Sequence, residues 1–97
     1  MARVPLLPGV PQLAESGFIT GASARNWAGY GHDVMLADGV TPVQQALLTD
    51  PQTSGGLLVA CDGDTVEDVL ALFRREGFAD AAVIGEMAAG AARVEVV

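Results

Sequence analysis

The segment Asp50–Leu57 constrains the fold of this chain more than any other, because it combines Pro51 with two adjacent glycines. Such a composition interrupts helices and strands and therefore predicts a loop. The loop leads directly into the apolar run 57–61, which is typical of a strand that is covered on both faces. We therefore expect a tight connection into a buried strand.

The same loop carries chemical groups that bind anions in proteins. Adjacent glycines let backbone N–H groups approach a ligand, and hydroxyl groups donate hydrogen bonds to phosphate oxygens. The alternative is a structural loop whose Ser and Thr side chains satisfy their own backbone. The loop precedes its strand, whereas ligands of open parallel sheets bind at the carboxyl ends of strands, which favours a structural or interdomain role. The candidate residues for a phosphate-facing or interdomain-facing loop are Asp50, Gln52, Thr53, Ser54, Gly55 and Gly56.

The second half of the chain predicts a β-α-β-β unit. We expect strands at residues 57–61, 82–87 and 92–97. A right-handed crossover makes the first two strands parallel, and the last strand pairs most simply antiparallel between them. The fold class is therefore α/β (α+β), with a split unit over residues 57–97.

Local signals define the helix of this unit. Asp64 is the expected N-cap, with Glu67 as its capping-box partner. Gly77 is the expected stop in the left-handed conformation, after which Phe78 folds back on Phe73.

Residues 1–51 predict an irregular half with short helices. One helix is expected over residues 8–16, with Gly17 at its stop and Phe18 in a Schellman arrangement. A better-defined helix is expected over Thr41–Leu48, with a capping box from Thr41 to Gln44.

The stretch Gly21–His32 between them is rich in glycine. It predicts one helical turn capped by Ser23, followed by loop. Within it, Arg25 and Asn26 are candidates to contact a ligand or a facing domain, and the alternative is plain stabilisation of the loop. Trp27 is expected to be a core or interface anchor, and His32 an exposed or capping side chain rather than a site residue.

Charge excludes several functions. The net charge is −7 and the five basic residues are all arginines, which argues against a nucleic-acid surface and excludes the lysine of a P-loop.

No apolar run approaches the roughly 20 residues that span a bilayer, so we expect no membrane partner. The N-terminus lacks the apolar core of a signal peptide, so we expect a cytoplasmic protein. Cys61 is expected to be a small buried apolar residue.

Four stretches together resemble one known family. The run 48–58, with its Asp-Pro-Gln-Thr-Ser-Gly-Gly core, resembles the C-terminal region of selenophosphate synthetase (selenide, water dikinase). Three further stretches agree in order and spacing: Val4–Gly9, the glycine-rich stretch from Gly17 to Gly31 with Arg25-Asn26, and Ala82–Glu86.

The resemblance implies a two-domain enzyme of the aminoimidazole ribonucleotide synthetase-like superfamily. Such an enzyme converts selenide, ATP and water to selenophosphate, AMP and phosphate, with Mg²⁺ as the metal. In the family, the reactive Cys or Sec, the essential lysine and most metal-binding aspartates belong to the N-terminal domain. This chain has no lysine and resembles only the last part of the C-terminal domain. We therefore expect no catalytic and no metal-binding residues in it.

The resemblance predicts a single incomplete domain over residues 1–97, irregular over 1–51 and β-α-β-β over 52–97. We expect it to be inactive alone and to hold no cofactor, with the N-terminal catalytic domain or a second copy of the chain, as in a dimer, as its partner. One alternative is a stand-alone binding, regulatory or oligomerisation module that retains the fold. Another is a different synthetase-like enzyme, although the run 48–58 argues against it.

Overall fold

The computed structural model describes residues 3–97, which divide into two compact units. The first unit comprises Leu6–Gly55 and Gly90–Val97, and the second comprises Gly56–Ala89 with residues 3–5. Each unit is described by itself. The expectation of a single incomplete domain stays a prediction.

Helix α1, Val10–Glu15, is short and ends as the sequence predicts. Gly17 adopts a φ of 91°, and its N–H bonds Ala14 O at 3.0 Å. The N–H of Phe18 bonds Leu13 O, also at 3.0 Å. These two bonds define a Schellman motif. It turns the chain sharply toward α2.

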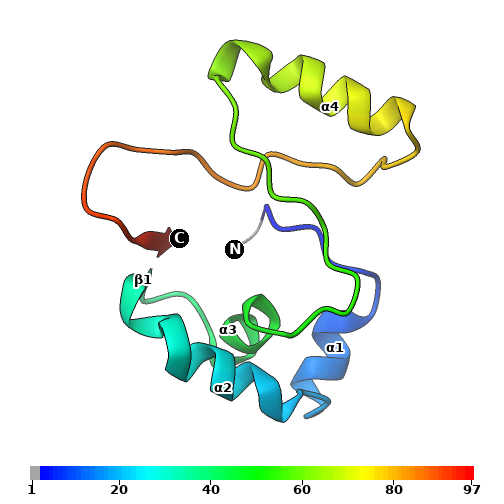
Figure 1. Cartoon of the computed structure of the whole chain (residues 1–97). Coiled ribbons are helices and arrows are strands. Elements are labelled where there is room, and N and C mark those ends of the chain that lie inside the picture. Colours follow the sequence, from blue (N-terminus) through cyan, green and yellow to red (C-terminus); the bar gives the residue numbers. More distant parts are fainter. Residues whose placement is uncertain (1–2) are drawn as a thin grey trace. The chain divides into compact units, whose positions relative to one another are not determined.

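Helix α3, Pro42–Leu48, confirms the predicted capping box. The N–H of Gln44 donates to Thr41 Oγ1 at 3.2 Å, and the N–H of Thr41 donates to Gln44 Oε1 at 2.8 Å. Two backbone donors at the start of the helix are thus satisfied reciprocally. α3 contacts both α1 and α2 (Figure 1).

The expectation of one turn followed by loop after Gly21 was wrong, because Gly21–Tyr30 forms the continuous helix α2. Its N-cap is Thr20 rather than Ser23. The two glycines inside it lie in its first and last turns, where their entropic cost matters least, and alanines fill much of the remainder. Side-chain contacts with α3, described below, stabilise the helix further.

A short parallel ribbon completes the first unit. After the 3₁₀ turn Gly31–Asp33, strand β1, Val34–Leu36, pairs in parallel with β2, Val94–Val96. β2 lies inside the expected last strand, but it pairs with β1 and not antiparallel between 57–61 and 82–87. The sequence did not predict β1.

The second unit is built around helix α4, Val66–Arg75. The predicted stop is confirmed: Gly77 has a φ of 94°, and the N–H of Phe78 bonds Phe73 O at 2.9 Å. The two phenylalanine rings meet edge to face with centroids 6.2 Å apart. The half-buried side chains of α4 are those of the predicted face, Val66, Val69, Leu70 and Phe73.

The predicted start of α4 was wrong. A 3₁₀ turn, Gly63–Thr65, precedes the helix, and Thr65 is the N-cap without a side-chain cap bond. In that turn the N–H and the hydroxyl of Thr65 both bond Asp62 O, at 3.0 and 2.9 Å. The turn therefore replaces the capping box expected from Asp64 and Glu67.

The expected strands at 57–61 and 82–87 were also wrong, since within residues 3–97 neither stretch is hydrogen bonded into a sheet. Figure 1 draws both as plain coil, one before and one after α4 along the chain. Leu57 and Leu58 are each 82% exposed, and Cys61 is exposed rather than buried. An apolar run becomes a strand only when another strand satisfies its backbone groups.

The α/β fold class is confirmed, as helices combine with a short parallel sheet. Among residues 3–97 no helix is both long and apolar enough to span a membrane.

Candidate functional site

The carboxylate of Asp50 is the centre of a polar cluster just beyond the C-terminus of α3. Its Oδ1 accepts a hydrogen bond from Thr20 Oγ1 at 3.2 Å. Its Oδ2 accepts one from Gln52 Nε2 at 2.6 Å. Neutral donors of this chain therefore engage both carboxylate oxygens, and Asp50 organises the start of its own loop.

Two hydroxyl groups extend this cluster onto α2. Ser23, which is 3% exposed, places its Oγ 3.3 Å from Thr20 Oγ1. A threonine hydroxyl has one proton, and Thr20 donates it to Asp50. The proton between the two hydroxyls must then come from Ser23. The hydrogen bonds therefore run from Ser23 to Thr20 to Asp50.

Asn26 holds the residue before Asp50. Its Nδ2 donates to the backbone oxygen of Thr49 at 2.8 Å. Thr49 follows the last residue of α3 and is 4% exposed, and its hydroxyl donates to the carbonyls of Gln45 and Ala46 at 3.0 and 3.2 Å. The last carbonyls of a helix have no partner inside the helix. Asn26 and Thr49 satisfy this end of α3 with side chains.

The remainder of the loop is exposed. Gln52–Gly56 lies on the surface, with a turn at Thr53 and Ser54. Neither Gly55 nor Gly56 has a positive φ. An anion nest alternates right-handed and left-handed residues, so these two glycines do not form one in this conformation.

The two candidate residues on α2, Arg25 and Asn26, differ in their contacts. Asn26 joins the cluster, whereas the side chain of Arg25 is exposed and forms no hydrogen bond or ion pair within residues 3–97. Consecutive helical residues point about 100° apart, which explains the difference. His32 also stays outside the cluster, in an exposed pair with Asp33 at 3.2 Å.

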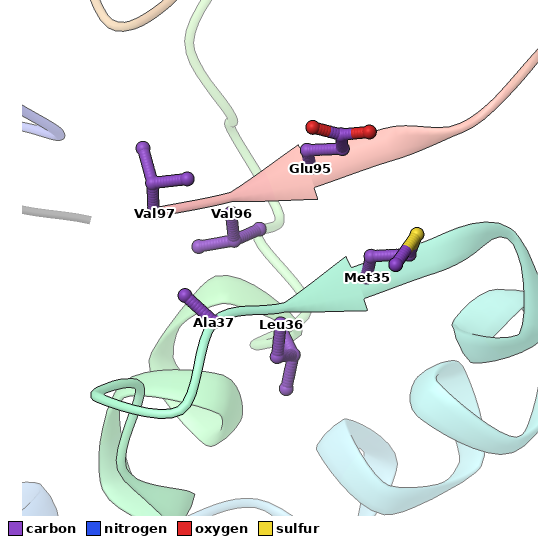
Figure 2. A pocket seen from close by; sticks show the side chains of 6 residues that line it. All are labelled: Met35, Leu36, Ala37, Glu95, Val96 and Val97. Atoms are coloured by element: carbon purple, nitrogen blue, oxygen red, sulfur yellow. The ribbon is translucent and has the colours of Figure 1, made fainter.

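A shallow cavity of about 180 Å³ lies at the β1–β2 ribbon, lined by Met35, Leu36, Ala37, Glu95, Val96 and Val97. Figure 2 shows Met35 and Glu95 on one face of the ribbon and Leu36 on the other. Glu95 is the only charged side chain in the lining, and it is paired with Arg93 at 2.6 Å. The cavity is smaller than ordinary ligand sites, which measure roughly 300–1,000 Å³.

Residues 12–97 match the protein family described as AIR synthase related protein, C-terminal domain. The chain belongs to this family. The match covers the Asp50 cluster and both strands. Together with the relatives named below, it confirms the resemblance of the chain to the C-terminal part of selenophosphate synthetase.

Several relatives of this AIR synthase related domain carry the name selenide, water dikinase. The chain is 65% identical over 95 residues to that of Burkholderia cenocepacia, covering 98% of this chain and 27% of the relative. It is 62% identical over 95 residues to that of Pseudomonas straminea, with the same coverage. For Rhizobium meliloti the identity is 48% over 97 residues, covering 100% and 28%. The chain thus spans about 27% of the length of the curated relatives it matches. No solved structure matches.

The carboxylates and other metal-ligating side chains of residues 3–97 are dispersed. Among residues 3–97, no three His, Cys, Asp or Glu side chains gather as metal ligands, and Asp50 is the only carboxylate of the cluster. Mg²⁺ is bound through carboxylates together with substrate phosphates. The residues present therefore do not fit a self-contained Mg²⁺ site.

Sequence reasoning named Asp50, Gln52 and Asn26 but missed Thr20 and Thr49 as members of the cluster. Ser23 was named only as a helix cap. The signal for Thr20 was its position directly before Gly21, where an N-cap residue is expected.

Proposed function

We propose that this chain serves as the C-terminal segment of a selenide, water dikinase, the enzyme that forms selenophosphate, AMP and phosphate from selenide, ATP and water. The observation that carries this proposal is the 65% identity over 95 of its 97 residues to a protein of that name. The stretches that carry the resemblance include loop 50–55, and hydrogen bonds from Thr20 and Asn26 hold the chain at its start.

In this proposal the chain contributes structure and part of the wall of an active site. The chain has no lysine, and within residues 3–97 it has no cluster of metal-ligating side chains. ATP and Mg²⁺ are therefore held mainly by an N-terminal catalytic domain, and the isolated chain is inactive. Loop 50–55 faces that domain or the phosphates bound there, in a cytoplasmic enzyme that functions as a dimer.

A chimera tests this role. The matching segment of the Burkholderia cenocepacia enzyme is replaced by this chain, and selenide-dependent formation of AMP from ATP is measured with Mg²⁺ present. We expect the chimera to turn over and the isolated chain to show no such activity. An inactive chimera that is folded and of the parental oligomeric state would overturn the proposal, as would normal turnover by the chain alone.

The second candidate is a stand-alone binding, regulatory or oligomerisation module. It is favoured by the exposed apolar side chains of the second unit, among them Leu57, Leu58, Ile84 and Met87. Exposed apolar side chains in such number are typical of surfaces that another chain covers. Sedimentation velocity of the isolated chain across a concentration series tests it: a defined dimer supports this module, and a monomer at every concentration contradicts self-association.

A further inference from the structure

We propose that Asn26 and Thr20 are positioning residues, which fix loop 50–55 on α2 and thereby support the activity of the assembled enzyme. The inference rests on the proposed function for its enzymatic consequence, but its structural part concerns this chain alone. It assigns a role to two side chains that lie outside the Asp50–Leu57 sequence motif.

The first anchor is the hydrogen bond from Asn26 Nδ2 to Thr49 O at 2.8 Å. Asn26 is half-buried and Thr49 is 4% exposed, so water competes poorly for this carbonyl. The bond ties the last turn of α3 to the middle of α2, directly before the loop begins. Removing the amide leaves a shielded carbonyl without its donor, which is costlier than losing an exposed hydrogen bond.

The second anchor is the hydrogen bond from Thr20 Oγ1 to Asp50 Oδ1 at 3.2 Å, supported by Ser23 Oγ at 3.3 Å. At 3.2 Å this exposed contact is longer than a strong hydroxyl–carboxylate hydrogen bond, so it is the weaker of the two anchors. Asp50 also accepts a hydrogen bond from Gln52 Nε2 at 2.6 Å, so its carboxylate connects Thr20 to the Gln52 side chain of the loop.

The two anchors come from the N-cap and the middle of α2. Ser23 and Asn26 are three residues apart, a spacing that makes their side chains neighbours on the helix, and Thr20 is the N-cap residue that precedes it. α2 and α3 contact each other directly, and Figure 1 shows them next to each other. The helix pair thus holds the beginning of the loop.

Beyond Gln52 the loop lacks such anchors. Within residues 3–97, the hydroxyls of Thr53 and Ser54 form no hydrogen bond with other side chains or backbone, and both residues are exposed. Their placement depends on the anchors at Thr49 and Asp50. Displacing reactive or binding groups by about 1 Å can lower a rate roughly 100-fold, so loss of either anchor is expected to affect turnover.

The first test measures backbone order in the full 97-residue chain by ¹⁵N relaxation. In the unmodified chain we expect order parameters near those of rigid backbone, about 0.85, at Thr49, Asp50 and Gln52, and values below about 0.6 there in Asn26→Ala and Thr20→Val. Thr20→Ser keeps the hydroxyl and should restore the order. Arg25→Ala is the matched control, because the side chain of Arg25 makes no hydrogen bond within residues 3–97.

The second test measures kcat and KM of the chimera with the same substitutions. We expect kcat to fall roughly 10- to 100-fold for Asn26→Ala and Thr20→Val, and to recover in Thr20→Ser. Thr41→Ala controls for stability, since it weakens the opposite end of α3 and leaves both anchors intact. A merely structural role predicts that Thr41→Ala and Asn26→Ala lose activity in proportion to their loss of stability.

The outcomes are separable. An inactive unmodified chimera refutes the proposed function, and the relaxation data alone then decide whether the anchors position the loop. Unchanged order parameters in both Asn26→Ala and Thr20→Val overturn the inference. Increased disorder with an unaltered kcat in an active chimera overturns its enzymatic part. If Asn26→Ala fails to fold by circular dichroism, Thr20→Val and its serine rescue carry the test.

Discussion

The indole ring of Trp27 lies directly over Gly31. A Cβ at position 31 would lie 2.7 Å from Cε2 and 2.8 Å from Cδ2 of the ring, closer than real Cβ contacts allow. Trp27 is half-buried at the end of α2, and Gly31 begins the 3₁₀ turn that leads into β1. The absence of a side chain at residue 31 therefore lets the indole pack over the connection between helix and strand.

We expect Gly31→Ala to destabilise the first unit, because the added methyl group forces the ring to move. Overpacking of this kind typically costs about 1–3 kcal/mol. A lower thermal midpoint and a red shift of the tryptophan emission should accompany each other, since a displaced ring is more exposed to water.

Gly29→Ala is the matched control for this substitution. A Cβ at Gly29 meets no atom within 4 Å, and the residue lies inside α2. Alanine is favoured over glycine in a helix by roughly 0.5–1 kcal/mol, so the control should be neutral or stabilising. Equal midpoints and emission maxima for the two variants would contradict the proposed packing.

At the end of α4 we expect Gly77→Ala to be destabilising for a different reason. The φ of Gly77 is 94°, a conformation that costs a residue with a Cβ about 1–2 kcal/mol, although open space surrounds the position. The helical circular dichroism signal should melt at lower urea concentration, and the aromatic NMR shifts of Phe73 and Phe78 should move as their ring contact loosens.

Gly85→Ala provides the comparison, since that glycine has no positive φ and a Cβ there would meet no atom within 4 Å. The two variants add the same methyl group to an open site and differ in backbone conformation. If both variants unfold at the same urea concentration, backbone strain at Gly77 does not lower the stability of the second unit and the prediction fails.

The helix ends were predictable because their chemistry is local. The capping box joins Thr41 and Gln44, which are three positions apart, and the Schellman motif at Gly77 depends on one left-handed residue followed by an apolar one. Both signals can be recognised without knowing what packs against the helix. At Asp64 the local rule failed, because the chain inserts a 3₁₀ turn with Thr65 bonded to Asp62.

Strand pairing was less predictable because it depends on distant partners. Val34–Leu36 is too short to show any periodicity, and its partner lies about sixty residues away at Val94–Val96. Conversely, the run 57–61 has the composition of a buried strand, yet within residues 3–97 it has no hydrogen-bonded partner strand. Composition reveals apolar character, but it does not reveal which segment will satisfy the backbone.

The candidate site was predictable in part for the same reason. Asp50 and Asn26 were recognised from their motifs, but their roles depend on contacts made 30 and 23 residues away along the chain. Thr49 lies within the run 48–58 and Thr20 stands at an N-cap position, but neither signal indicates the contact that the residue makes. Those contacts follow from the packing of α2 against α3.

At the start of α3 we expect Thr41→Ala to cost about 1 kcal/mol, the usual effect of losing an N-cap side chain. The hydroxyl accepts the N–H of Gln44 at 3.2 Å, and alanine leaves that donor to water. Chemical denaturation gives the change in the free energy of unfolding. Thr53→Ala is the control, because Thr53 is exposed and belongs to no helix cap; a cost equal to that of Thr41→Ala would argue against the capping box in solution.

The exposed thiol of Cys61 gives a direct measure of whether another domain covers the apolar run 57–61. In the isolated chain we expect N-ethylmaleimide to modify Cys61 under native conditions nearly as fast as in denaturant, because the residue is exposed. Mass spectrometry follows the reaction, and Cys61→Ser provides the unreactive control. In the chimera the same thiol should react markedly more slowly if the N-terminal domain covers this run. A thiol that is already protected in the monomeric native chain would show instead that residues 57–61 are buried by the chain itself, as the sequence pattern alone had indicated.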